Sequence, residues 1–480
     1  MRNFAAVTAG VTAALAAGGF VAAQPAPKLA ASDASFVAFE QPVLALTHVV
    51  LFDGTGAPAQ RDMTIVVSGG RIAAVGPAAT TAPPSGATVV DGEGKTVLPG
   101  FVLMHEHLFY PNSKGGYGDY PEAFTRLYLA AGETTIRTAG SLNPYADLAV
   151  ARAIRAGRQV GPDMDVSGPY IEGEPKSVAR MPAVTGPASV AKLVDYWTGE
   201  GATSWKVYEH ISRADLRATV AAAHAHGLKV TGHICSVTYQ EAIDAGIDNL
   251  EHSFQEASDF VAGKKPDACP PWPVRLQSLI ALDPDGPEAS KLIKSLVDHK
   301  VALTSTYAID ETLMAGKPPV SAETLAPLSP ALRAAYSAAW AQNQKGGLGK
   351  LVAAFMPKMA RMEHRFVAAG GLLMAGSDPT GFGGVVPGTS AQHQFHMMIE
   401  EGFSAPEAIR VMSRNGAVFL HRDKEIGTVA AGKRADLVLL DGDLAKTNDA
   451  IDHVSTVFKS GVGYNSRAIA AAYAGKVGLD

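Results

Sequence analysis

The sequence of 480 residues has few cysteines, no basic tract and no low-complexity segment. Its only cysteines are Cys235 and Cys269, so at most one disulfide can form within the chain. The sequence is compatible with that disulfide and equally with two buried free thiols. The net charge of −5 and the absence of a basic tract argue against nucleic acid as a partner. With 47% hydrophobic and 18% charged residues, the composition is typical of a globular protein.

The N-terminus differs in character from the rest of the chain. Arg2 precedes an apolar, Ala-rich run that ends at Phe20, and the small residues Val21-Ala-Ala23 follow. This pattern predicts a secretory signal peptide over residues 1–23. The alternative is an N-terminal membrane anchor, but the run is short for a span and rich in Ala and Gly. Cleavage would give a periplasmic or secreted enzyme with no membrane contact, in which residues 24–40 form a linker.

The remaining chain is too long for one small domain. Short β-type runs occupy both of its ends. Among them, Met63–Val67 and Arg71–Val75 are joined by Ser68-Gly-Gly70, which predicts a hairpin. We therefore predict a small β-sandwich built from residues 41–98 and residues 422–480.

Residues 99–421 alternate short β-type runs with helical runs, which predicts an α/β fold, specifically a (β/α)8 TIM-type barrel. Two Pro-rich stretches, Ile171–Gly186 and Phe260–Pro287, interrupt the alternation after strands three and six. Because active sites of barrels form at the carboxyl ends of strands, we interpret both as substrate-shaping loops, with neutral surface insertion as the alternative. The predicted strands are Phe101–Met104, Thr134–Arg137, Met164–Ser167, Ser204–Tyr208, Leu228–His233, Asn249–His252, Val301–Tyr307 and Gly371–Asp378.

Two histidines, His105 and His107, end the first predicted barrel strand. Residues i and i+2 of a strand point to the same side, so this pair makes half of a metal site. Other polar residues at or near strand ends are Lys206, His233, His252 and Asp378, on strands four, five, six and eight. Four imidazoles, one carboxylate and one lysine suit two divalent ions.

Each of these residues also has a structural interpretation. A single buried His or Lys is more often structural than catalytic, and the spacing of His105 and His107 alone could arise by chance. That all six fall on barrel strand ends for structural reasons is far less expected, so we favour the metal site.

From about residue 42 to residue 465 the chain resembles the amidohydrolase superfamily, in its imidazolonepropionase- and prolidase-like branch. The resemblance depends on several motifs in order, each weak alone. They are Leu98-Pro-Gly-Phe-Val-Leu-Met-His-Glu-His107, Trp205-Lys206-Val-Tyr208, Thr231-Gly-His233, Asn249-Leu-Glu-His-Ser253, Ala375-Gly-Ser-Asp378 and Gly427-Thr-Val-Ala-Ala-Gly-Lys-Arg-Ala-Asp-Leu437. It implies a barrel with a flanking β-sandwich and metal-dependent hydrolysis, with zinc as the expected metal. It also implies a homo-oligomer, since relatives often are, although no interface is visible in the sequence.

The residues and the resemblance favour the same assignment of ligands to the two metal ions. His105, His107 and Asp378 hold one ion, and His233 and His252 hold the other. The resemblance implies that N6-carboxylated Lys206 bridges the two ions together with a water. Asp378 would accept a proton from that water during attack and then pass it to the leaving group, as general base and then general acid.

Substrate contacts are less defined. Tyr208 lies two residues after Lys206 and so on the same side of its strand, where it could bind a substrate carbonyl or pack in the core. Arg137 could pair with a substrate carboxylate or form a structural ion pair. Further candidates are Tyr170 and His393, and then, more weakly, Tyr110, Tyr307 and His396.

The leading hypothesis is hydrolysis of an amide bond in a small molecule, a dipeptide or an N-acyl amino acid. A lactone, carboxylic ester or phosphotriester could be attacked at the same site, and the sequence does not separate these bonds. A non-catalytic binding module is disfavoured, because it would be expected to lose metal ligands and all six are present.

Overall fold

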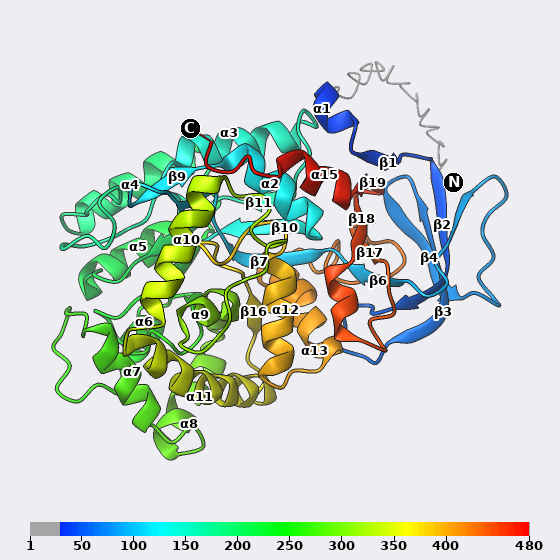
Figure 1. The fold of residues 1–480 in the computed structure, drawn as a ribbon. Helices are drawn as coiled ribbons and strands as arrows, with labels where there is room; N and C mark the ends of the chain where they lie inside the picture. Colours follow the sequence, from blue (N-terminus) through cyan, green and yellow to red (C-terminus); the bar gives the residue numbers. More distant parts are fainter. Residues whose placement is uncertain (1–28, 480) are drawn as a thin grey trace, which may run out of the picture.

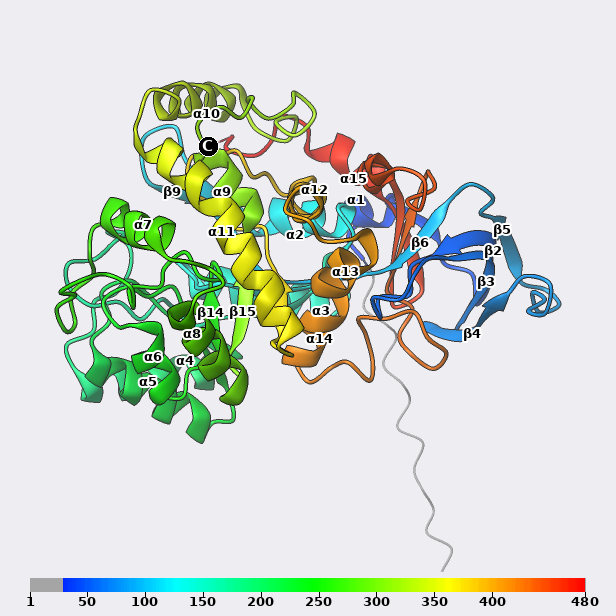
Figure 2. The ribbon, with the colours of Figure 1, turned by 90° about the horizontal axis from the view of Figure 1, so that it is seen from below.

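A computed structural model describes residues 29–479, so the predicted signal peptide over residues 1–23 lies outside the described residues. Two bodies lie side by side: a sheet of long strands, and a larger body of parallel strands covered by helices (Figure 1). Figure 2 shows from below that β2 to β5 of the sheet lie on the side away from the helical body. Among residues 29–479, no helix is both long and apolar enough to cross a membrane.

Both ends of the described chain contribute to the nine-stranded sheet. Its order is β1-β19-β18-β17-β6-β2-β3-β4, with β5 paired to β2. The connecting strand is β6, which pairs antiparallel with β17 and parallel with β2. The strands are β1 (Val37–Phe39), β2 (Val43–Leu51), β3 (Gln60–Ser68), β4 (Arg71–Pro77), β5 (Thr88–Asp91), β6 (Thr96–Pro99), β17 (Leu437–Leu440), β18 (Val454–Lys459) and β19 (Val462–Asn465).

The predicted hairpin is present as β3 and β4, with Ser68 opposite Arg71. Gly69 and Gly70 both have positive φ, 56° and 76°, as a two-residue hairpin turn requires. A Cβ on Gly70 would lie 2.8 Å from the carbonyl oxygen of Ser460, so the C-terminal strands pack directly against this turn.

Buried side chains from the two chain ends form one apolar cluster in this sheet, which includes Leu46, Ile65, Val97, Leu437 and Phe458. The two ends therefore share a core, as the sequence suggests. The β-sandwich itself stays a prediction, since the described strands belong to one hydrogen-bonded sheet.

The larger body contains eight parallel strands in chain order. They form two sheets, β11-β10-β7 and β12-β13-β14-β15-β16. A parallel bridge between Ser167 and Ser204 links the sheets on one side. On the other side, the backbone N–H of Asp378 donates to the carbonyl oxygen of His105 at 3.0 Å. The strands are β7 (Phe101–Glu106), β10 (Glu133–Thr138), β11 (Asp163–Asp165), β12 (Ser204–Val207), β13 (Lys229–Gly232), β14 (Asn249–Glu251), β15 (Ala302–Ser305) and β16 (Leu373–Ala375).

Helices follow the barrel strands and bury apolar faces against them, which is why all the residues of most of these strands are buried. They are α2 (Pro121–Ala130), α3 (Pro144–Arg155), α4 (Pro187–Glu200), α5 (Arg213–Ala225), α6 (Tyr239–Asp244), α8 (Pro287–Asp298) and α11 (Leu348–Ala368). The other elements are the hairpin β8 (Phe109–Pro111) and β9 (Tyr117–Asp119), and the helices α7 (Trp272–Ala281), α9 (Tyr307–Leu313), α10 (Pro330–Asn343), α12 (Ser390–Glu400), α13 (Ala405–Arg410), η1 (Val411–Asn415), α14 (Gly416–Phe419), η2 (Asn448–Asp452) and α15 (Ser466–Tyr473). The predicted loop Phe260–Pro287 thus contains a helix, α7.

The predicted linker was wrong for residues 31–39, which form the short helix α1 (Ala31–Ala34) and strand β1. Asp33 is 1% exposed and accepts hydrogen bonds from Arg126 Nε at 2.8 Å and Nη2 at 3.0 Å. It also accepts from the backbone N–H of Val160 at 3.0 Å. A composition rich in Ala, Pro and Ser does not reveal that one buried carboxylate anchors the segment to α2.

We predict that Asp33→Ala lowers the free energy of unfolding by about 3–5 kcal/mol, because Arg126 would stay buried without its partner. Urea denaturation followed by circular dichroism measures this loss. Ser32→Ala, at an exposed position of the same short helix, is the matched control and should change stability by less than about 0.5 kcal/mol. A loss as small as that of the control would show that the ion pair does not anchor the segment.

Candidate active site

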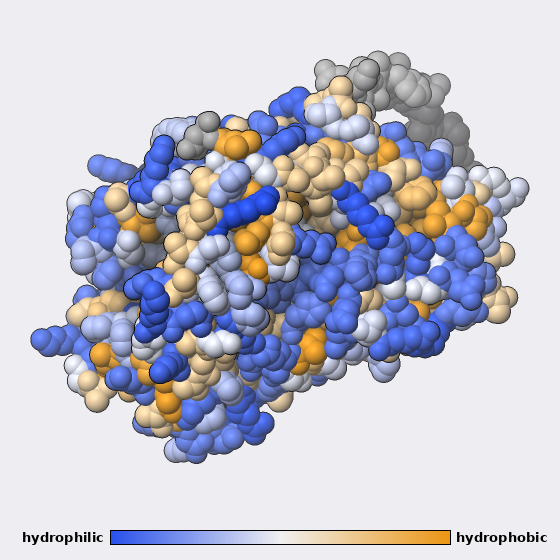
Figure 3. Space-filling view, viewed as in Figure 1, coloured by the Kyte–Doolittle hydropathy of each residue, from blue (hydrophilic) through white to orange (hydrophobic). Residues whose placement is uncertain are grey.

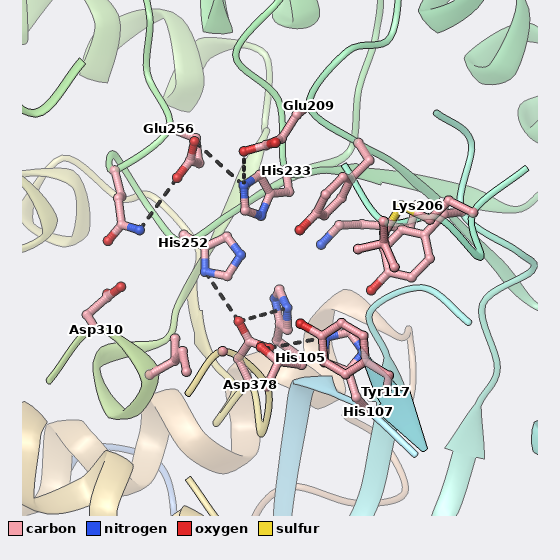
Figure 4. A pocket seen from close by; sticks show the side chains of 18 of the residues that line it. His105, His107, Tyr117, Lys206, Glu209, His233, His252, Glu256, Asp310 and Asp378 are labelled. Atoms are coloured by element: carbon pink, nitrogen blue, oxygen red, sulfur yellow. Dashed lines mark hydrogen bonds and ion pairs between the residues drawn. The ribbon is translucent and has the colours of Figure 1, made fainter. Parts of the chain in front are cut away.

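One cavity of about 270 Å³ lies at the carboxyl ends of the barrel strands. All six predicted metal ligands line it, as Figure 4 shows: His105, His107, Lys206, His233, His252 and Asp378. The structure therefore brings together side chains that are separated by up to 273 positions in the sequence, from the end of β7, β12 and the segments after β13, β14 and β16.

His105, His107 and Asp378 form the tightest group. Their potential ligand atoms all lie within 4.8 Å of one another. His107 Nε2 is 3.2 Å from Asp378 Oδ1, and His105 Nε2 is 3.7 Å from Asp378 Oδ2. Two imidazoles and a carboxylate at these separations could converge on one divalent ion.

The second predicted pair lies beside this group. The rings of His233 and His252 are 4.5 Å apart between centroids, and His252 Nδ1 is 3.9 Å from Asp378 Oδ2. Lys206 lines the same cavity. The assignment of each ligand to one ion or the other stays a prediction.

The backbone is unusual at two of these residues. His252 has φ 57° and Asp378 has φ 52°. These values lie in the left-handed region of backbone conformation, which residues other than glycine seldom adopt. Each such residue costs on the order of 1–3 kcal/mol, and such residues gather at functional sites. Close packing accompanies them: a Cβ on Gly376 would lie 2.2 Å from the Cβ of His105, so only glycine lets β16 approach β7 here.

Burial favours the neutral imidazole at His105 and His252. It lowers the pKa of His105 to about 4 and holds the pKa of His252 well below its ordinary value. Burial alone would raise the pKa of Asp378, but the neighbouring histidines, His105 first, hold it well below the usual range. Neutral imidazoles and an ionised carboxylate are the donors that a divalent ion requires, so this set fits zinc.

Lys206 departs from that donor set, because an ammonium cannot bind a cation. Burial lowers its pKa to about 8, which increases the share of neutral amine. The neutral amine is the form that could take up carbon dioxide, as the predicted carboxylation requires.

Sequence reasoning missed Glu251, a buried carboxylate at the end of β14. Its Oε2 is 2.8 Å from His105 Nδ1, its Oε1 accepts from Arg137 Nη1 at 2.9 Å, and Lys206 Nζ lies 3.6 Å away. Burial would raise its pKa, yet Lys206, His105 and Arg137 hold it well below the usual range. Because a carboxylate only accepts, His105 Nδ1 must donate, which leaves Nε2 as the free ligand atom. The sequence did contain a sign of this role, because Glu251 is an acidic residue within a predicted buried strand.

Two predicted substrate contacts line the cavity and two do not. Tyr170 and Tyr208 line it, with ring centroids 5.1 Å apart in an edge-to-face arrangement. Arg137 is 1% exposed, and its guanidinium binds Glu251, the carbonyl oxygen of Met104 and Thr231 Oγ1 beneath the cavity. The substrate role predicted for Arg137 is therefore corrected to the alternative, a structural ion pair.

His393 is the second correction. It lies on α12, and its Nε2 pairs with the carboxylate of Glu311 on α9 instead of lining the cavity. The weaker candidates Tyr110 and Tyr307 also lie outside the lining, where their hydroxyls donate to the Gly383 carbonyl and to Glu363 Oε2. Tyr110 and Tyr307 are buried against elements that are distant in the chain, which a local sequence pattern does not reveal.

Both Pro-rich stretches do contribute to the wall. Val178 and Met181 come from the first, and Trp272 and Arg275 from the second. The Cys235–Cys269 disulfide ties the second stretch to the segment after His233, which decides between the two alternatives for the cysteines. Sequence analysis also missed the further lining residues Phe109, Tyr117, Leu142, Glu209, Gln255, Glu256, Ile309, Asp310, Leu313, Thr380 and Gly381.

We predict that Glu251→Gln weakens zinc binding by about 10- to 100-fold, because His105 loses the carboxylate that orients it. Competition with a chromogenic chelator measures the affinity. The matched control is Glu133→Gln, another buried glutamate of a barrel strand that does not line the cavity. Equal zinc affinity in the two variants would contradict the orienting role.

Known proteins resemble this chain in sequence and in fold. The model of the amidohydrolase family matches residues 96–463. An uncharacterised protein of Mycobacterium tuberculosis is 30% identical over 228 residues, 44% of this chain and 56% of that protein, so the match spans about half the length of this relative. The imidazolonepropionase of Rubrobacter xylanophilus is 26% identical over 433 residues, 83% of this chain and 90% of that protein.

Solved structures agree on the fold. A putative prolidase from Bifidobacterium longum aligns with a TM-score of 0.62 at 25% identity, covering 88% of this chain and 94% of that chain. A Xaa-Pro dipeptidase with bound methionine in the active site aligns with a TM-score of 0.66 at 19% identity, covering 88% and 100%. These likenesses support a (β/α)8 barrel for the parallel strands. With the family model matched over residues 96–463, this chain belongs to the amidohydrolase family.

Proposed function

We propose that this protein is a secreted, metal-dependent hydrolase that cleaves an amide bond in a dipeptide or an N-acyl amino acid. The observation that carries the proposal is the convergence of six metal-ligand candidates on one cavity at the carboxyl ends of the strands. Membership of the amidohydrolase family supports the same chemistry.

Two zinc ions are proposed as the cofactor. His105, His107 and Asp378 would hold one ion, His233 and His252 the other, and N6-carboxylated Lys206 would contribute to both. Ions held there would polarise the substrate carbonyl and lower the pKa of the attacking water.

The chain's own residues would carry the proton transfers. The ionised carboxylate of Asp378 would take a proton from the attacking water and deliver it to the leaving nitrogen, as general base and then general acid. Tyr208 lines the cavity with its ring 4.5 Å from that of His233, and its hydroxyl would bind the substrate carbonyl oxygen. Tyr170, edge-on to Tyr208, would pack against the substrate's apolar part.

The size of the cavity and the known proteins guide the substrate class. A volume of about 270 Å³ lies just below the usual range for small-molecule sites, which suits a substrate of dipeptide size. The printed names of similar proteins include imidazolonepropionase, prolidase and Xaa-Pro dipeptidase. We extend from them only the bond class, a carbon–nitrogen bond.

Location and assembly are also part of the proposal. The Cys235–Cys269 disulfide supports export to an oxidising compartment, where disulfides persist. On the face seen in Figure 3, hydrophobic residues of the described chain gather over α15 and elsewhere lie in small groups among hydrophilic ones. Homo-oligomerisation stays a prediction from the resemblance.

We predict about two zinc ions per wild-type chain, falling to about one or fewer in Lys206→Ala. Elemental analysis of protein purified without chelator, against an independent protein concentration, measures the stoichiometry. Lys229→Ala is the control, a partly buried lysine at the opposite end of strand β13 from the site. Unchanged zinc content and unchanged turnover in Lys206→Ala would contradict the proposal that Lys206 bridges two zinc ions.

We predict that Asp378→Asn lowers kcat for an amide substrate by about 10²–10⁴-fold, since it removes the proton acceptor. Turnover is measured on parallel panels of dipeptides, N-acyl amino acids, lactones and phosphotriesters. Wild-type activity confined to the lactone or phosphotriester panel would refute amide hydrolysis while leaving the metal site intact.

A further inference from the structure

Asp310 lies in the wall of the cavity but belongs to no group of metal ligands. It is in the first turn of α9 and is 0% exposed. Among the described residues, neither of its carboxylate oxygens has a hydrogen-bond partner. A buried carboxylate without partners is costly, so its presence in the wall calls for a ligand that completes it.

The side-chain charges that act most strongly on Asp310 are negative. Burial raises its pKa well above the ordinary value, the carboxylates of Asp378, Glu256 and Glu363 raise it further, and the adjacent side chain of Gln255 lowers it. The cations of the cavity are committed elsewhere. Arg275 Nη2 binds Glu256 Oε2 at 2.5 Å, and Lys206 is the proposed carboxylated metal ligand.

A second acceptor without a partner lies in the same wall. Gln255 is 5% exposed and lines the cavity, and its Oε1 has no hydrogen-bond partner within residues 29–479. Its Nε2 donates to Glu256 Oε1 at 3.5 Å, which orients the amide. Figure 4 shows Asp310 and Glu256 on the far side of His252 from Lys206, so this acceptor-rich corner flanks the metal-ligand group.

The opposite wall has a different character. Side chains of Phe109, Leu142, Tyr170, Val178 and Met181 make it largely apolar. They cluster with Tyr117, which Figure 4 shows on the other side of His252 from Asp310. A ligand that spans the cavity would therefore meet apolar groups on one side of the metal-ligand group and unpaired acceptors on the other. Those acceptors need a ligand that donates hydrogen bonds and carries positive charge.

We propose that Asp310 and Gln255 form a subsite for a primary ammonium group of the substrate. An ammonium has three donors and no acceptor, which matches two carboxylate oxygens and one amide oxygen. The inference rests on the proposed function and narrows it: a dipeptide with a free amino group is the preferred class over an N-acyl amino acid. The ammonium could be the α-ammonium or that of a lysine side chain.

Binding of simple ligands to the zinc-loaded full chain tests the subsite without requiring turnover. Isothermal titration calorimetry compares L-leucine with 4-methylpentanoate, and 6-aminohexanoate with hexanoate, none of which contains an amide bond. In the wild type, the ligand with an ammonium in the recognised position should bind about 10- to 100-fold more tightly than its matched analogue without the ammonium, as expected for a charge-assisted hydrogen bond. A preference in the first pair identifies the α-ammonium, and a preference in the second identifies the side chain.

Asp310→Asn keeps the shape and removes the charge, so it should abolish that preference and leave binding of the analogue without the ammonium within about threefold. Gln255→Met should reduce the preference by a smaller factor, and it provides a test if Asp310→Asn does not fold. Asp147→Asn is the control, a buried aspartate outside the cavity whose pKa burial raises to about 7. Circular dichroism confirms folding of each variant.

Two outcomes would overturn the subsite. One is equal binding of the ligands with and without an ammonium by the wild type. The other is a preference that survives in both Asp310→Asn and Gln255→Met, which would mean that Asp310 is a protonated structural carboxyl. Failure of the proposed function is distinguishable, since turnover confined to lactones or phosphotriesters would leave the binding preference for ammonium intact.

Discussion

The carboxyl end of the barrel depends on the buried carboxylate of Glu251. It binds His105 on one oxygen and Arg137 on the other, with Lys206 at 3.6 Å. Removing such a charge from water is unfavourable unless partners surround it, and the donors on Arg137 and His105 supply the compensation. The same contacts decide which nitrogen of His105 carries the proton. The interior of the barrel is thus a charge-balanced network that orients a metal-ligand candidate from beneath.

Backbone constraints add to this network. His252 and Asp378 both adopt left-handed φ values, which would be lost if the surrounding structure did not hold them. Gly376 allows β16 to lie against His105, and the backbone N–H of Asp378 closes the contact at 3.0 Å. The ends of the first and last barrel strands are therefore fixed to each other at the site itself.

The two walls of the cavity differ in polarity, whereas the metal-ligand candidates between them form its floor. The floor contains histidines, a carboxylate and a lysine that could serve the hydrolysis of many bonds. Selectivity has to come from the walls, one apolar and one rich in carboxylates. The disulfide Cys235–Cys269 holds part of the second wall, because Arg275 donates to the carbonyl oxygen of Pro270 and to Cys269 Sγ. Within that wall, Glu256 has a cation partner and Asp310 has none among the described residues.

Local patterns in the sequence were sufficient for the alternation of strands and helices and for the metal-ligand candidates. A strand has a period of two and ends at a recognisable turn, so His105 and His107 could be placed on one face before any fold was known. Tyr208 was placed on the cavity side by the same period.

Tertiary structure alone decided the roles of residues whose partners are distant in the chain. Arg137 and Glu251 are 114 positions apart, and only the arrangement of the parallel strands in space makes them a pair instead of a substrate contact and an unassigned acid. The ion pair of Asp33 with Arg126 also depends on elements that are distant in the chain. The lack of a hydrogen-bond partner for Asp310 among the described residues likewise depends on all the elements that line the cavity. Periodicity reports the side of an element on which a residue lies, whereas charge pairing and burial depend on elements that the sequence separates.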